Sequence, residues 1–174
     1  MNHSIVKYFL LVGLVFSNSV FAQGGSETRT CDKNIIYTKT SEYPALGTHE
    51  VWKDPRGLVW GETGNMGKIN HQDAVSYCKM IGARLPTAEE FDLFRQDMGH
   101  SKVPLDDNGI PGRGSYQYAC QVLGFQDADW TSSPVKTLSD MFIVFTGGEF
   151  ESRCDNHACV ADVRCVINTM PVDL

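Results

Sequence analysis

The residues whose types suggest chemistry lie mostly in short polar stretches. Cys154, His157 and Cys159 (CDNHAC) combine two thiols with an imidazole, which are ligand types that zinc prefers. A tetrahedral zinc site needs a fourth ligand, which this stretch lacks, and disulfide formation competes for both thiols in an oxidising compartment. The stretch therefore favours disulfide-bonded cysteines over a zinc centre.

An acidic stretch, Asp106-Asp107-Asn108-Gly109, offers the oxygen atoms that calcium takes as ligands. It is shorter than a full calcium-binding loop and lacks a glutamate at the far position. A solvated turn explains the same residues without any ligand. We therefore expect no cofactor, and calcium is the one ion that the stretch leaves open.

Groups that catalyse hydrolysis do not form a recognisable set. Ser115 follows Gly114 but lacks the flanking pattern of a nucleophile elbow. Beyond residue 22, four histidines follow no catalytic spacing: His49, His71, His100 and His157. The carboxylates of Asp127 and Asp129, beside Trp130, are the pair that an enzyme would use if they faced each other in a pocket.

Two helices with their own start signals must position these groups. Asn70 is a good N-cap for a first helix that ends at Gly82, and Thr87 with Glu90 forms a capping box for a second that ends at Gly99. Capping explains the acidic pair at 89 and 90 without catalysis. The apolar spacing predicts these buried faces: Ala74, Val75, Cys78 and Ile81 on the first helix, and Phe91, Phe94 and Met98, with Leu93 beside them, on the second.

Short strands and turns occupy most of the remaining chain. Two apolar runs around Asp54-Pro55-Arg56-Gly57 predict a hairpin, and Gly147-Gly148 predicts the turn of another. Pro134 is expected to end a strand. The tryptophans (Trp52, Trp60 and Trp130) are interpreted as core residues. Other expected strands are 34–38, 130–133, 141–145, 150–154 and 160–167, and the irregular region 101–129 holds a short helix at 115–123.

Residues 1–22 have the features of a secretory signal peptide. Lys7 precedes a short apolar run, and the small residues Val20 and Ala22 lie where a cleavage site requires them. The run is far shorter than the stretch needed to span about 30 Å of hydrocarbon. We therefore expect an exported chain, secreted or held in a periplasm or at a cell surface, and not membrane-spanning.

Charge and composition narrow the class of partner. The 174 residues are 42 % apolar and 21 % charged, the balance of one globular domain. Because Lys7 is the only charged residue in 1–22, the rest carries 14 basic and 21 acidic residues, a net charge of −7. No basic patch is long enough to neutralise a nucleic-acid backbone, so no nucleic-acid partner is expected.

Several motifs now occur together in one order. They are the tryptophan hairpin, Tyr77-Cys78, the segment 84–87 (RLPT), 130–133 (WTSS) and 163–166 (VRCV). This set resembles the bacterial Lcl C-terminal domain family, a secreted domain of mostly unassigned function. It is also distantly similar to the formylglycine-generating, sulfatase-modifying superfamily, and both have the C-type-lectin-like fold. The resemblance covers about residues 48–167.

The resemblance implies an α+β, C-type-lectin-like fold: two helices on a small, mostly antiparallel twisted sheet, with long loops and disulfides. The expected organisation is a signal peptide at 1–22, an N-terminal arm at 23–47 and a lectin-like domain at 48–174. No active-site motif of the formylglycine-generating enzymes is found, so that activity is not carried over. The calcium-binding loop motifs of related lectins are also missing.

Six cysteines beyond the leader indicate disulfides, and six allow 15 connectivities. The family resemblance implies that Cys78 of the first helix pairs with Cys165 of the last strand. Two arrangements stay open for the others: Cys120–Cys159 with Cys31–Cys154, or Cys154–Cys159 with Cys31–Cys120.

These observations predict an exported, non-catalytic binding domain that recognises a glycan or a surface protein. The expected contact residues lie in the long loop region: Asp106, Asp107, Asn108, Arg113, Tyr116 and Tyr118. Two alternatives stay open, namely an enzyme acting on cell-wall or polysaccharide material and a structural subunit of a surface assembly. The oligomeric state is not predicted.

Overall fold

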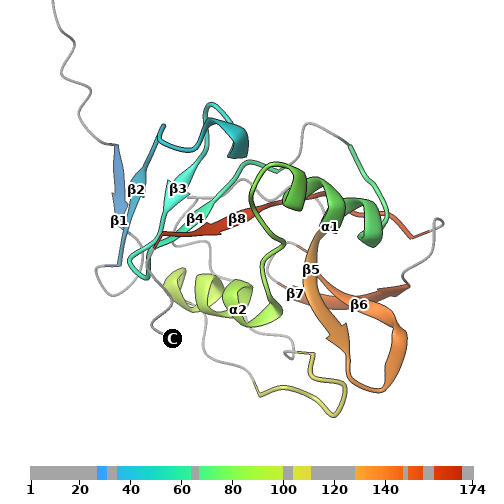
Figure 1. Cartoon of the computed structure of the whole chain (residues 1–174). Helices are drawn as coiled ribbons and strands as arrows, with labels where there is room; N and C mark the ends of the chain where they lie inside the picture. Colours follow the sequence, from blue (N-terminus) through green and yellow to red (C-terminus); the bar gives the residue numbers. More distant parts are fainter. Residues whose placement is uncertain are drawn as a thin grey trace, which may run out of the picture.

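The computed structural model describes residues 27–30, 35–63, 67–99, 104–110, 128–146, 149–154 and 159–169. These residues form an α+β structure with two helices and two antiparallel sheets (Figure 1). The predicted signal peptide and the predicted helix at 115–123 lie outside the described ranges. Within those ranges, no helix is both long enough and apolar enough to cross a membrane.

The larger sheet has five strands in the order β1-β2-β3-β4-β8. Their bounds are β1 Thr28–Thr30, β2 Ile36–Lys39, β3 Trp52–Lys53, β4 Leu58–Trp60 and β8 Val166–Asn168. Strands β1 and β2 lie within residues 23–47, the predicted N-terminal arm, and extend the sheet; β2 overlaps the strand expected at 34–38. Burial of Tyr37 in β2, edge-on to Phe94 at 5.8 Å between ring centroids, explains why this segment joins the core.

The predicted hairpin at 51–60 is confirmed by strands β3 and β4. The Asp54 carboxylate accepts hydrogen bonds from the backbone N–H groups of Arg56 and Leu58, both at 2.9 Å. The Asp54 carbonyl accepts from the Gly57 N–H at 3.0 Å. Gly57 has φ +83°, a value that favours glycine, so the turn residues serve the roles that the sequence predicted.

Helix α1 (His71–Met80) begins as predicted, because Asn70 Oδ1 accepts a hydrogen bond from the Asp73 N–H at 2.9 Å. Ala74 and Cys78 are fully buried. The prediction for Val75 is wrong: this side chain is 42 % exposed, and His71 is buried instead. Val75 lies about 100° around the helix from Ala74, which places it outside a narrow buried face.

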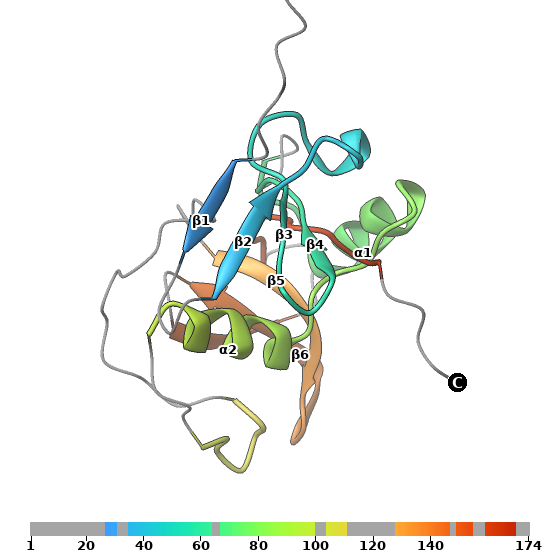
Figure 2. The ribbon, with the colours of Figure 1, turned by 90° about the vertical axis from the view of Figure 1, so that its left-hand side faces the viewer.

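Helix α2 (Ala88–Asp97) has the predicted capping box. Thr87 Oγ1 accepts from the Glu90 N–H, and the Glu90 carboxylate accepts from the Thr87 N–H. Phe91 contacts Trp60 of the larger sheet at 5.3 Å and stacks on Phe145 of the smaller sheet at 4.6 Å between ring centroids. Helix α2 is therefore packed between the two sheets (Figure 2). Phe94 and Met98 are buried as expected, whereas Leu93 faces solvent.

The smaller sheet contains β5 (Ala128–Val135), β6 (Leu138–Thr146) and β7 (Glu149–Cys154) in that order. One sheet was expected, so this division corrects the predicted architecture. The register Thr146↔Glu149 confirms the second hairpin. Pro134 was predicted to end a strand, but β5 continues through it to Val135. Shifts in strand register on both sides of Pro134 accommodate the proline. The last strand is shorter than expected, since only Ala161 and Asp162 form isolated bridges before β8.

A disulfide joins Cys78 of α1 to Cys165, just before β8, across a sequence separation of 87. This is the pairing that the family resemblance implied. Cys159 is also disulfide-bonded, and Cys31 and Cys120 lie outside the described ranges. The three tryptophans are fully buried, which confirms their interpretation as core residues.

Candidate functional site

The predicted contact residues Asp106, Asp107 and Asn108 lie in a turn. Asp106 Oδ1 accepts from the backbone N–H groups of Asn108 at 2.9 Å and Ile110 at 2.8 Å. The Asn108 carbonyl accepts from the Lys136 N–H at 3.0 Å, which fastens the turn to the β5–β6 connection. The carboxylate of Asp106 thus serves the turn, and Asp107 is exposed to solvent.

The other three predicted contact residues, Arg113, Tyr116 and Tyr118, lie outside the described ranges, as do His157 and Asp127. The loop site therefore stays a prediction, of which the structure describes only the residues at 106–108. Within the residues that it describes, no three or more His, Cys, Asp or Glu side chains are grouped to hold a metal ion.

Asp129, the other member of the predicted carboxylate pair, is fully buried in β5. Its Oδ2 lies 3.4 Å from Arg164 Nε, and Arg164 also donates to the Gly61 carbonyl at 2.7 Å. Burial raises the pKa of Asp129 to about 6, Arg164 opposes that rise, and the nearby charge of Asp162 adds to it. The group is closed to solvent and joins the two sheets, so we assign it a structural role.

Other buried or half-buried carboxylates are also paired with arginines. Arg56 lies 2.9 Å from Asp54 and 2.5 Å from Asp97. The same pattern holds for Arg84 with Glu90 at 2.5 Å and for Arg95 with Asp92 at 2.8 Å. These ion pairs hold turns and helices in place.

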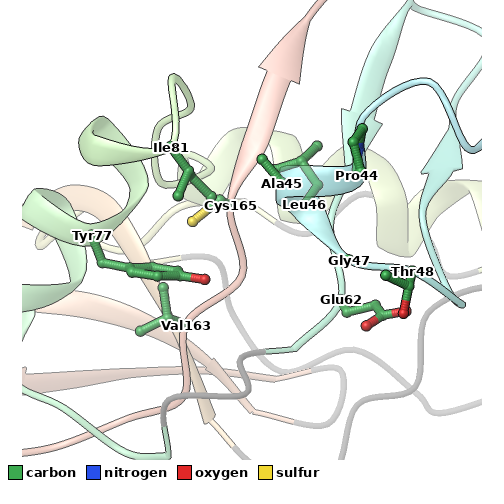
Figure 3. A pocket seen from close by; sticks show the side chains of 10 residues that line it. All are labelled: Pro44, Ala45, Leu46, Gly47, Thr48, Glu62, Tyr77, Ile81, Val163 and Cys165. Atoms are coloured by element: carbon green, nitrogen blue, oxygen red, sulfur yellow. The ribbon is translucent and has the colours of Figure 1, made fainter.

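A small cavity lies where α1 meets the loop that follows β2. Its volume is about 120 Å³, below the roughly 300–1,000 Å³ of pockets that enclose a whole drug-sized ligand. Figure 3 shows residues from separate segments converging on it: Pro44, Ala45, Leu46, Gly47, Thr48, Glu62, Tyr77, Ile81, Val163 and Cys165.

The polar side of the cavity is built around the half-buried Glu62. Its Oε1 accepts from the Glu50 N–H at 2.6 Å and from the His49 N–H. Burial, the largest single influence, raises the pKa of Glu62, but the N–H groups of Glu50, His49 and Thr48 together with His49 bring it below its ordinary value. Glu62 is therefore ionised at neutral pH.

Gly47 is required for this arrangement. Its φ is +138°, and a Cβ atom added there would lie 2.5 Å from Glu62 Cδ. Gly47 follows the 3-10 helix η2 (Pro44–Leu46), and the Leu46 carbonyl accepts from the Glu62 N–H at 2.9 Å. These contacts hold Glu62 against the 47–50 loop.

The opposite wall is mainly apolar. Val163 and the disulfide-bonded Cys165 are buried, and Tyr77 and Ile81 come from the last turn and the C-cap of α1. The Tyr77 hydroxyl points into the cavity (Figure 3). An aromatic ring and a carboxylate around an apolar floor suit a ligand with an apolar body and a polar or cationic end.

Sequence reasoning missed this site because its walls come from four separated segments with no shared motif. Pro44-Ala45-Leu46-Gly47 was treated as part of an arm, and Glu62 lies in a glycine-rich link. The RLPT and WTSS motifs, at 84–87 and 130–133, lie outside the cavity. One local signal was present: Gly47 lies two and three residues before His49 and Glu50, whose backbone N–H groups bind Glu62.

Comparison with protein-family models, curated proteins and solved structures finds no match to this chain.

Proposed function

We propose that this chain is an exported, non-catalytic binding domain of C-type-lectin-like fold, of the Lcl C-terminal domain type, which recognises a glycan or a surface protein. Export is supported by the signal-peptide features of residues 1–22 and by the disulfide chemistry of Cys78, Cys165 and Cys159. The two-helix, antiparallel architecture is compatible with the proposed fold.

One observation carries the proposal. Asp129, the carboxylate that the enzyme hypothesis would use, is buried with Arg164, whereas the cavity beside Glu62 is open to solvent. A catalytic carboxylate must reach a substrate, and a group fully removed from solvent does not. A preformed recess on a disulfide-linked scaffold suits recognition without chemistry.

Glycan-array binding and pull-down from cell-surface extracts test the proposal on the exported chain. We expect saturable capture of a glycan class or of one protein. The triple variant Arg113→Ala, Tyr116→Ala and Tyr118→Ala tests the predicted loop contacts, with Glu89→Gln on the exposed side of α2 as a control. A folded protein that captures nothing in either screen would refute the proposed function.

A further inference from the structure

We infer that the cavity beside Glu62 receives a primary alkylammonium group, the side-chain end of a lysine on a partner protein. The inference rests on the proposed binding function and names one contact within it. It is carried by three features of the cavity: a carboxylate that pairs with no arginine or lysine among the described residues, a wall with apolar and aromatic side chains, and a small volume.

The carboxylate of Glu62 differs from those of the half-buried Glu90 and the buried Asp97. Glu90 and Asp97 each lie 2.5 Å from an arginine. The groups that act on Glu62 are backbone N–H groups and His49, with no described lysine or arginine side chain among them. A carboxylate has about four lone-pair sites, so the two N–H groups bonded to Glu62 Oε1 leave capacity for a further donor. An incoming cation would supply the missing positive charge.

The lining matches the rest of a lysine side chain. Leu46, Val163 and Cys165 present apolar surface to a methylene stem, which lysine readily buries while its ammonium reaches a polar group. The Tyr77 ring and hydroxyl face the cavity (Figure 3) and offer a cation–π surface and an acceptor.

The volume also fits one side chain. At about 120 Å³ the cavity is smaller than the roughly 300–1,000 Å³ of pockets that enclose a whole drug-sized ligand, so it suits the end of one side chain better. Lysine has a flexible four-carbon stem that ends in a compact ammonium. The net charge of −7 beyond residue 22 further attracts a cationic partner.

The direct test is an NMR or calorimetric titration of the exported chain with N-acetyl-lysine methylamide, and with N-acetyl-norleucine methylamide, which keeps the stem and lacks the ammonium. We expect lysine to bind at least about tenfold more tightly, which equals about 1.4 kcal/mol. Equal binding, or no binding, overturns the inference. Glucosamine is a third arm, and binding of glucosamine without lysine would also overturn it in favour of an amino sugar.

Variants locate the contact. Glu62→Gln should weaken lysine binding about tenfold, Tyr77→Phe about two- to threefold, and the charge-matched Glu89→Gln not at all. Unchanged affinity in folded Glu62→Gln refutes the site. If Glu62→Gln does not fold, the comparison of lysine and norleucine binding to the unsubstituted chain still tests the inference.

Pull-down with Glu62→Gln separates the two proposals. Capture that persists in this folded variant leaves the binding function intact and rejects the lysine pocket. Absence of capture by the unsubstituted chain rejects the binding function itself.

Discussion

The segment 163–165 connects two regions with opposite electrostatic designs. Val163 and Cys165 line the cavity beside Glu62, whereas Arg164 between them bonds to Asp129, Gly61 and Thr63. This alternation is what an extended backbone imposes on successive side chains. On one side the buried Asp129 is paired with the Arg164 guanidinium. On the other, the half-buried Glu62 accepts hydrogen bonds from backbone N–H groups.

The difference separates structural charge from charge available to a ligand. Asp129 is closed to solvent, so its charge requires a fixed partner within the protein. Glu62 keeps contact with a cavity, and backbone donors stabilise its ionised form without filling the space beside it. In the sequence, Asp129 drew attention because it lies beside Trp130, yet its role is structural. The accessible carboxylate, Glu62, was identified only from the tertiary structure.

The largest expected effect comes from removing the covalent attachment of this segment. The double variant Cys78→Ala and Cys165→Ala should lose about 4–5 kcal/mol of unfolding free energy, because the bridge closes a long loop in the unfolded chain. Urea unfolding without reductant measures the loss, with mass spectrometry to verify the remaining bridges. A loss below about 1 kcal/mol would show that packing alone holds α1 to the segment.

The next largest effect is expected from breaking the Arg164–Asp129 ion pair, on the side of the 163–165 segment opposite the cavity. Arg164→Met should lose about 3–5 kcal/mol, because it leaves Asp129 buried without its partner. Arg84→Met is the matched control, since the Arg84–Glu90 pair is more exposed and should contribute about 1 kcal/mol or less. Equal losses in urea unfolding for the two variants would contradict the structural role of Arg164.

The two carboxylates should also respond oppositely to pH. The pKa of Asp129 is about 6 in the folded chain against an ordinary 3.8, so its contribution to stability is full below pH 3.8 and is lost as the pH rises through 6. Relative to Asp129→Asn, the unsubstituted chain should therefore lose about 1–3 kcal/mol of stability between pH 4 and pH 7. Unfolding curves at several pH values measure this change, with the exposed Asp107→Asn as a control. A difference that grows with pH would contradict the assignment.

The smallest effect is expected at Glu62. Its lowered pKa means that its stabilising contribution is present above its ordinary 4.5 and is lost as the pH falls through the folded value. Glu62→Gln should cost about 1 kcal/mol at pH 7 through weaker bonds to the 48–50 backbone, and the difference should shrink in acid. Thermal unfolding at both pH values checks this, and a loss as large as that of Arg164→Met would make Glu62 a structural residue.

Local features were predictable from short stretches of sequence. The Asn70 N-cap, the Thr87–Glu90 capping box and the turn at 54–57 each depend on atoms only a few residues apart. Predictions that needed the surroundings of a side chain were less successful. Val75 and Leu93 follow apolar spacing, yet both face solvent because the surfaces against which α1 and α2 pack are narrower than the spacing implies.

Sequence alone determined that the chain is α+β and where its helices begin. It also predicted disulfides, from an even number of cysteines in a chain expected to be exported. Only the tertiary structure decided that the strands divide into two sheets, that Arg164 neutralises Asp129, and that Glu62 borders a cavity. These pairings join residues far apart in the chain, such as Arg164 and Gly61, separated by 103 positions. Local preferences act within a turn or a helix end, whereas such contacts arise only when packing brings distant segments together.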